Sequence, residues 1–343
     1  MAAAPARGPR GEPPDHSAGG RRRRAEDLEL VDAFLHVLQR GDLVNLAAAT
    51  LVASTPLVLA ALGGLMCERS GVVNIALEGI MLTSAFVGYA VAFNTHNLTL
   101  GVLAAVLAGM AIAGLHAVLS IAFVVDQIVS GTVINILAVG ITGVFYRAYI
   151  QQAEVRGPGV LPVWKLPGLG DIPIVGPIFF QQAFVTYAAL ALIVVVHLVL
   201  FRTVWGLRTR ASGEHPRAAE TAGINVYLVR YVNVIASGAL AGLGGCYFSL
   251  QQVGNFLPGM TGGQGFIALA AMIFGRWTPL GSFLASLLFA GAGALAGRLQ
   301  IYGVHIPYQV LGMLPYVLTI VVVAGAVGRA VAPAAVGKPY RRS

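Results

Sequence analysis

The chain has 343 residues, of which 57% are hydrophobic and only 10% are charged, and its mean hydropathy is +0.78. A soluble domain carries about a quarter charged residues, so this composition excludes an ordinary soluble protein and indicates a chain solvated by lipid, where charge is costly. The net charge of +8 does not indicate a nucleic-acid polymer as partner. Arginine and lysine gather in the N-terminal tail, after residue 201 and in the C-terminal tail, which is the distribution of the positive-inside bias.

The N-terminal region, residues 1–42, precedes the first long apolar stretch. Residues 1–27 are rich in Ala, Pro, Gly and Arg, and we expect them to form a disordered basic tail. No signal peptide is apparent, because the first apolar stretch begins near Leu43 and is too long for one. Residues 28–40 are predicted to form a short amphipathic helix at the membrane interface.

Nine apolar segments follow. A helix needs about 20 residues to cross the hydrocarbon core, and every segment except 265–275 is long enough. A short apolar segment predicts a discontinuous helix, which in transporters lies near the pathway. We therefore predict an all-α integral membrane protein with about nine to ten transmembrane helices in a domain of residues 43–328. The segments are 43–66, 75–93, 100–125, 128–146, 183–201, 231–250, 265–275, 279–297 and 307–327.

Two of these segments resemble each other. Residues 75–81 read IALEGIM and residues 267–273 read IALAAMI, and each stretch begins four residues after a glycine, Gly71 or Gly263. Two pseudo-repeated halves, each with a discontinuous helix, would suit a transporter whose pathway lies between the halves.

A polar, basic segment, residues 202–230, interrupts the apolar pattern. Pro216 suits the first turn of a helix, Glu214 near that end would complement the helix dipole, and Gly223 is suited to end the helix. Two roles fit this predicted helix: a solvated connection, or a surface on which a soluble partner docks.

The positive-inside bias places the segment 202–230 and the basic C-terminal tail, residues 329–343, in the cytoplasm. Counting back across five spans then places the arginine-rich N-terminus outside. Either this tail is an exception to the bias, or the count of crossings differs by one.

Glu78 is the most isolated charge within an apolar segment, and a charge at the bilayer centre costs about 2.5–3.5 kcal/mol on insertion scales. It either faces the pathway and accepts hydrogen bonds from substrate, or serves as a structural carboxylate in a broken helix. Asn74 shares its helical face if the helix continues. Asn255, Gln264 and Phe266 lie around the short second-half segment and either line a site for a flat, polar ligand or belong to a solvated loop.

Three single polar residues within spans, His116, Asn135 and Asn233, are predicted to form interhelical hydrogen bonds. Two Gly-x-x-x-Gly spacings, 238–242 and 293–297, are predicted to serve helix packing. The two cysteines of the chain form neither a disulfide framework nor a metal cluster, and we predict no metal site, cofactor or catalytic residue.

Three stretches resemble the signatures of ABC-importer permeases of the ribose, simple-sugar and nucleoside class, and most closely its nucleoside-type branch. Residues 206–224, GLRTRASGEHPRAAETAGI, resemble the cytoplasmic coupling segment of that family. Residues 68–81, ERSGVVNIALEGIM, and 262–281, GGQGFIALAAMIFGRWTPLG, resemble its first and second signatures. His215 departs from the family's usual Asn. The resemblance covers roughly residues 43–327.

The resemblance implies a translocation subunit, not an enzyme, in the bacterial cell (inner) membrane. It would move a nucleoside or related ribose-containing small-molecule solute by alternating access, together with a cytoplasmic ABC ATPase, an extracytoplasmic substrate-binding protein and a second permease subunit, identical or not. The chain lacks a phosphate-binding loop, so ATP hydrolysis requires a separate polypeptide. The residues implied for ATPase coupling are Arg208, Arg210, Gly213, Glu214, Pro216, Arg217, Ala218, Ala219 and Gly223.

Other substrates and mechanisms remain as alternatives. A simple sugar or a branched-chain amino acid would fit a permease of the same kind. A secondary transporter driven by an ion gradient would require buried ionisable pairs or an ion site on broken helices, for which only Glu78 and His116 are candidates.

Overall fold

The computed structural model describes residues 40–151, 157–302 and 331–341, with residues 310, 313 and 317. Within these residues, seven helices are long and apolar enough to cross a membrane, and one further apolar helix is shorter. This confirms the predicted all-α membrane class and is loosely consistent with nine to ten helices. The predictions for residues 1–39, and most of the predicted segment 307–327, lie outside the described residues.

The helices follow the predicted segments to within a few residues. The long helices are α2 (Arg40–Arg69), α3 (Leu77–Thr95), α4 (Leu98–Ala117), α5 (Gln127–Phe145), α7 (Phe184–Arg202), α10 (Val226–Cys246) and α12 (Pro279–Ile301), and the short ones are α6 (Val175–Phe179), α8 (Val204–Glu214), α9 (Pro216–Thr221) and α11 (Gln264–Phe274). Three of them continue as π-helical turns: α4 into η1 (Val118–Ala122), α5 into η2 (Tyr146–Ile150) and α10 into η3 (Tyr247–Val253).

Polar side chains fix where several helices begin. The Asn97 side chain accepts hydrogen bonds from the backbone N–H groups of Thr99 and Leu100 at the start of α4. Asp126 does the same at the start of α5. Such caps satisfy N–H groups that have no partner within the helix, and they explain why short polar residues separate the apolar segments.

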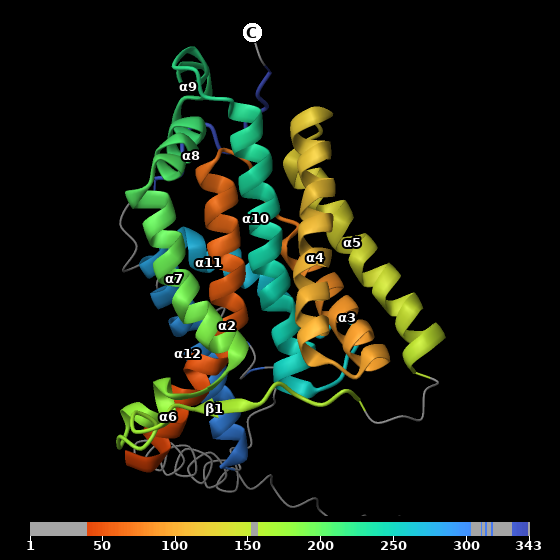
Figure 1. Ribbon diagram of the computed structural model, residues 1–343, viewed down its shortest axis with the longest axis vertical. Coiled ribbons are helices and arrows are strands. Elements are labelled where there is room, and N and C mark those ends of the chain that lie inside the picture. Colours follow the sequence, from red (N-terminus) through yellow and green to blue (C-terminus); the bar gives the residue numbers. More distant parts are fainter. Residues whose placement is uncertain are drawn as a thin grey trace, which may run out of the picture.

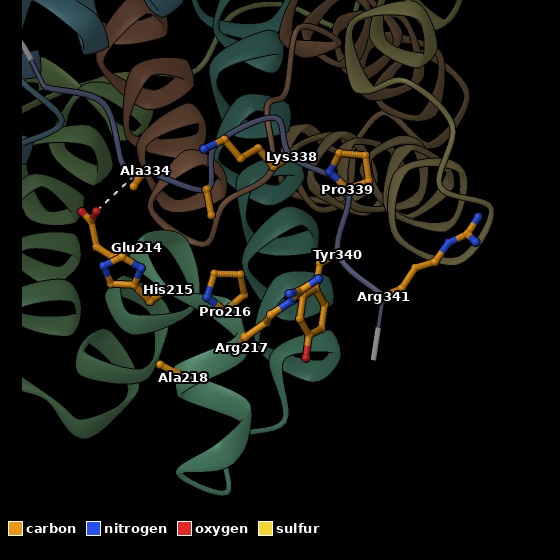
Figure 2. Close-up of a pocket in the computed structure, with 11 residues that line it drawn as sticks. Glu214, His215, Pro216, Arg217, Ala218, Ala334, Lys338, Pro339, Tyr340 and Arg341 are labelled. Carbon is orange, nitrogen blue, oxygen red and sulfur yellow. Dashed lines mark hydrogen bonds between the residues drawn. The ribbon is translucent and has the colours of Figure 1, made fainter. Parts of the chain in front are cut away.

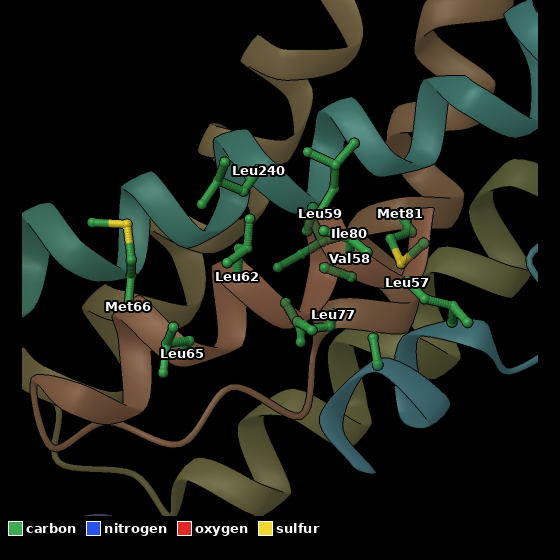
Figure 3. Packing of buried hydrophobic residues seen from close by; sticks show 14 of the residues in the cluster. Leu57, Val58, Leu59, Leu62, Leu65, Met66, Leu77, Ile80, Met81 and Leu240 are labelled. Atoms are coloured by element: carbon green, nitrogen blue, oxygen red, sulfur yellow. The ribbon is translucent and has the colours of Figure 1, made fainter. Parts of the chain in front are cut away.

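The central helix of the bundle is α2, which packs against α7, α10, α11 and α12. Its leucines form the middle of the apolar core, and Leu59, Leu62 and Leu65 are fully buried. Figure 3 shows these side chains meeting Leu77 of α3 and Leu240 of α10. The core is therefore built around one enclosed helix, while the outer faces of α4 and α5 expose apolar side chains, as a lipid-facing surface requires.

Small residues allow α4 and α10 to approach closely. A Cβ added to Gly242 would lie 2.7 Å from the backbone oxygen of Ala105. The predicted packing role of the spacing 238–242 is therefore confirmed. For Gly293 and Gly297 of α12, no atom of the described residues lies within 4 Å of an added Cβ. The helix packing predicted for this second spacing is therefore not found among the described residues.

The bundle has two distinct ends (Figure 1). Helices α8 and α9 and the C-terminal end lie at one end, and α6 lies at the other with β1 (Val163–Lys165). β1 pairs antiparallel with β2 (Gln181–Ala183), a pairing that the sequence analysis did not predict. The five spans before α8 run back to the start of α2 at the end opposite α9 (Figure 1), so the odd count of crossings holds for the described residues.

The two segments that resemble each other in sequence begin alike. Gly71 and Gly263 both have left-handed backbones, with φ of 95° and 84°, which glycine adopts without steric cost. Each precedes a helix that starts after an irregular stretch, α3 or α11. The shared conformation supports the predicted repeat.

Candidate functional site

The irregular backbone before α3 lies inside the bundle, and side chains from other helices satisfy its polar groups. The Val73 N–H donates to the Gln127 side chain (2.7 Å), and the Val73 carbonyl oxygen lies 2.9 Å from Nε2 of His116. Asn135 Nδ2 donates to the Ile75 carbonyl (3.0 Å). Irregular backbone is tolerated at membrane depth only when protein groups satisfy it in this way.

The interhelical roles predicted for His116 and Asn135 are confirmed, because Nδ1 of His116 lies 3.0 Å from Oγ of Ser130 in α5 and Asn135 Oδ1 accepts the Gly79 N–H of α3 (2.7 Å). Asn233 of α10 behaves similarly, because its Nδ2 donates to Oγ1 of Thr209 in α8 at 3.1 Å. Asn74, predicted for the pathway, is fully buried, and its side chain donates to Oγ of Ser237 in α10 (3.0 Å).

The Glu78 carboxylate lies where the starts of α3 and α11 meet. One oxygen accepts hydrogen bonds from Thr261 Oγ1 (2.6 Å) and the Gly263 N–H (2.8 Å), and the other accepts one from the Gly265 N–H (2.7 Å). A Cβ added to Gly265 would lie 2.5 Å from the Glu78 backbone, so the two helices are in direct contact. The carboxylate thus accepts hydrogen bonds from backbone N–H groups at the start of α11 that have no partner within that helix. The start of a helix also favours negative charge.

The other predicted pathway residues are more open. Asn255 is exposed and Gln264 is half-buried, while Phe266 exposes 47% of its surface. Gln264 and Phe266 lie in the first turn of α11, the helix whose start Glu78 binds, whereas Asn255 lies in the connection between η3 and α11. Gln251 of η3 is half-buried, and its side chain donates to Oγ1 of Thr186 in α7 (2.9 Å).

The helix predicted in the polar segment is α9, which begins at Pro216 and is followed by Gly223 in a left-handed conformation (φ 82°). Glu214 lies next to the N-cap His215 of this helix, near its start as predicted, but it is also the last residue of a preceding helix, α8, which the sequence analysis did not predict. The residues before it form a helix because they pack against α2 and α7, a contact that the local pattern does not reveal.

The predicted coupling residues divide between an outer and an inner surface. The inner ones pack on the bundle: Arg210 lies over the Phe201 ring, 5.2 Å from its centroid, and Gly213 and Ala219 are buried. Pro216 is half-buried. The outer ones are exposed: Arg208, Glu214, Arg217, Ala218 and Gly223.

Gly213 connects this region to the end of α2. A Cβ at Gly213 would overlap the Arg69 carbonyl oxygen, so only glycine permits this approach. Arg69 in turn donates through Nε and Nη2 to the Trp277 carbonyl (3.0 and 2.7 Å). The polar segment is therefore in contact with the last turn of α2 and, through it, with the turn between α11 and α12.

The C-terminal segment, residues 331–341, packs on the same region. The Ala335 N–H donates to the Gly213 carbonyl (2.8 Å), and the Ala334 N–H donates to a Glu214 carboxylate oxygen (3.1 Å). Between this segment and α9 lies a groove of about 690 Å³. Figure 2 shows Glu214, Pro216 and Arg217 on one side of it and Lys338 and Tyr340 on the other.

Tyr340 fixes the end of this segment. Its ring is buried, its hydroxyl donates to the Glu220 carboxylate, and the Arg230 guanidinium lies 5.4 Å from the ring centroid. Burial of the ring, together with the bond to Glu220, raises the pKa of Tyr340 to about 12, because both disfavour the phenolate. The sequence analysis had identified the tail only by its charge, and a single tyrosine among basic residues was the one further signal.

Comparison with known proteins places the chain in a family. Residues 46–323 match the family described as "branched-chain amino acid transport system / permease component", and the chain belongs to this family. It is 44% identical over 304 residues to the guanosine ABC transporter permease protein NupQ of Bacillus subtilis, covering 85% of this chain and 95% of that protein. It is 41% identical over 308 residues to the nucleoside ABC transporter permease protein NupC of Lactococcus lactis, covering 87% and 97%.

A third relative, the putative glucose ABC transporter permease protein TsgC13 of Haloferax volcanii, is 36% identical over 307 residues, covering 83% of this chain and 92% of that protein. No solved structure matches the chain. Family membership and the seven apolar helices establish a multi-pass permease of the bacterial inner membrane, which confirms the resemblance stated from the sequence.

Proposed function

We propose that this chain is the translocation subunit of an ABC importer for nucleosides, driven by a separate ATPase that docks on α9. The observation that carries the proposal is the contact of Gly213 with the last turn of α2. Gly213 belongs to α8, so the contact links the helix that directly precedes α9 to the central helix of the bundle. The two relatives with the higher identities, 44% and 41%, are named for guanosine and nucleoside transport, which supports this substrate class over the sugar of the 36% relative.

The end of the bundle that carries α8 and α9 faces the cytoplasm in this proposal. Exposed basic residues gather there, among them Arg208, Arg217 and Arg341, as the positive-inside bias requires. The outward side chains of α8 and α9 are then available to an ATPase. Rim charges of this kind affect the rate and specificity of assembly more than its affinity.

Movement of α9 passes into the membrane through α8. Because Gly213 touches the Arg69 carbonyl and Arg69 binds the Trp277 carbonyl, displacement of α8 moves the end of α2 and the end of α11 together. At its other end α11 is held by the Glu78 carboxylate. This sequence of contacts gives closure of the ATPase a route to the two discontinuous helices.

The substrate pathway, in this proposal, runs beside the starts of α3 and α11. Glu78 and Asn74 hold the two irregular segments in place through their hydrogen bonds. Phe266, Gln264 and Asn255 are accessible to solute. An exposed phenyl ring can stack on a flat base, and side-chain amides can both donate to and accept from ribose hydroxyls.

Three partners complete the transporter: the ATPase, an extracytoplasmic substrate-binding protein and a second permease subunit. Lactococcus lactis has two relatives of this chain that are named as nucleoside ABC transporter permeases, NupC and NupB, the latter 31% identical over 103 residues. This pair supports a non-identical second subunit.

Double substitution of Glu214 and Arg217 by alanine tests the docking role. Both side chains are exposed, so membrane insertion should be normal, while substrate-stimulated ATP hydrolysis and nucleoside uptake by the reconstituted transporter should fall together by at least about tenfold. Normal uptake by this variant would refute docking at α9. A panel of tritiated nucleosides, sugars and branched-chain amino acids in the same vesicles tests the substrate class.

A further inference from the structure

The C-terminal segment is held against α9 by contacts spread over its length. Ala335 bonds to the Gly213 carbonyl at one end (2.8 Å), and Tyr340 donates to Glu220 at the other. Tyr340 exposes only 7% of its surface. A segment with a defined register and a buried aromatic anchor is part of the folded surface, so it forms a fixed wall of the groove beside α9.

The C-terminal segment also covers a buried guanidinium, that of Arg230, which lies against the Tyr340 ring. Arg230 exposes only 2% of its surface, and its Nε and Nη2 atoms have no hydrogen-bond partner among the described residues. A buried cation is costly without compensation, and the face of an aromatic ring supplies some through a cation–π interaction. Arg230 is therefore stabilised when the C-terminal segment is in place.

The charge of the groove is predominantly positive. Arg217 of α9 lines one wall, Lys338 and Arg341 line the other, and all three are exposed. Among the described residues that line the groove, the carboxylate is that of Glu214, which already accepts the Ala334 N–H. Three cations facing a groove of about 690 Å³ favour an occupant that carries carboxylates.

We propose that α9 and the C-terminal segment form the two walls of one docking groove, which receives an acidic segment of the partner ATPase. This inference rests on the proposed function, because it assumes that the ATPase approaches α9. It adds a second contact surface, distant from α9 in sequence, whose cations make the assembly with the ATPase sensitive to salt concentration.

The test reverses the charges of Lys338 and Arg341, the two cations on the wall that the C-terminal segment forms. The complete transporter carrying Lys338→Glu and Arg341→Glu in this chain is isolated through a tag on the chain and placed in nanodiscs of neutral phosphatidylcholine. ATP hydrolysis retained on the permease is then measured after washes of rising NaCl concentration. The matched control is Arg147→Glu with Lys165→Glu, which changes the same number of exposed charges away from the groove.

In the double variant at residues 338 and 341, retained ATP hydrolysis should fall at least about tenfold after a wash that leaves wild type and control unchanged. Retention equal to wild type would overturn the proposal. A loss that appears in anionic but not in neutral lipid would also overturn it, by assigning the groove to lipid headgroups.

The outcome separates this inference from the proposed function. If Glu214→Ala with Arg217→Ala releases the ATPase while the charge reversal does not, α9 is the docking site and the C-terminal wall is not. If neither pair of substitutions changes retention, docking at α9 fails as well.

Discussion

The indole N–H of Trp277 donates a 2.6 Å hydrogen bond to the carboxylate of Glu68, a residue 209 positions earlier in the chain. This bond and the two from Arg69 to the Trp277 carbonyl attach the turn between α11 and α12 to the last turn of α2. Trp277 and Arg276 both have positive φ, 51° and 53°, which costs energy in residues other than glycine. The contacts with α2 compensate for that cost and hold the turn against the last turn of α2, which Gly213 of α8 also touches.

Trp277→Phe removes the indole donor and leaves the buried Glu68 carboxylate without that bond. The expected loss of stability is about 1–3 kcal/mol, the usual cost of an unsatisfied buried polar group. Thermal unfolding followed by size-exclusion chromatography in detergent measures it. Trp205→Phe, at a half-buried tryptophan of α8, is the matched control, and equal unfolding temperatures for the two variants would show that the bond to Glu68 does not stabilise the fold.

Glu78→Gln removes the charge that receives three donors at the start of α11. The amide has only one oxygen, and its N–H₂ group must face backbone N–H groups of Gly263 or Gly265, so we expect a loss on the order of 2 kcal/mol. Uptake should fall in parallel, because the two discontinuous helices lose their connection. Wild-type stability and uptake in Glu78→Gln would contradict the positioning role of the carboxylate.

Gly213→Ala places a methyl group against the Arg69 carbonyl. Overpacking of this kind costs about 1–3 kcal/mol, so α8 should shift away from α2. We expect nucleoside uptake per ATP hydrolysed to fall while the protein still inserts. Gly140→Ala is the control, because an added Cβ there has no atom of the described residues within 4 Å. If the two variants couple uptake to hydrolysis equally well, the contact does not transmit force.

Attachment of the C-terminal segment should depend on pH in the alkaline range. The folded-state pKa of Tyr340, about 12, is above the ordinary value near 10 for a free tyrosine. A raised pKa means that the neutral form is favoured in the folded state, so this stabilisation is complete below pH 10 and is lost as pH rises towards 12. The groups facing the hydroxyl and ring are Glu220, Tyr227 and Arg230.

A fluorophore at Lys338→Cys reports this change through its anisotropy. With Tyr340 present, the anisotropy of the fluorophore should fall between about pH 10 and 12. In the Tyr340→Phe variant, the anisotropy should show no step in that range. A step of the same size in both would assign the titration to another group.

The sequence predicted those parts of the structure that depend on neighbours along the chain. The apolar lengths predicted the spans and the short helix α11, and Pro216 with Gly223 predicted α9, because capping and turn chemistry act within a few residues. The sequence did not predict that α8 extends through Gly206 and Gly213, two glycines that weaken a helix. Packing against α2 and α7 overrides that weakness.

The candidate site shows the same division between residues whose roles follow from their neighbours along the chain and residues whose partners lie far away in sequence. His116, Asn135 and Asn233 were correctly assigned to interhelical hydrogen bonds, because a polar side chain in an apolar span has few other options. The partners of Glu78 and Glu68 lie more than 180 positions away, and no local pattern specifies such pairings. The register of the C-terminal segment on α9 was missed for the same reason.

Sidedness tests the central claim most directly, because an ATPase can dock on α9 only from the cytoplasm. The native cysteines, Cys67 and Cys246, are buried, so a membrane-impermeant maleimide should report single exposed cysteines placed at Ala218 of α9 and at Lys165 of β1. We predict that in intact cells the reagent labels Lys165→Cys and not Ala218→Cys, and that inverted membrane vesicles show the reverse. Labelling of Ala218→Cys in intact cells would contradict the account.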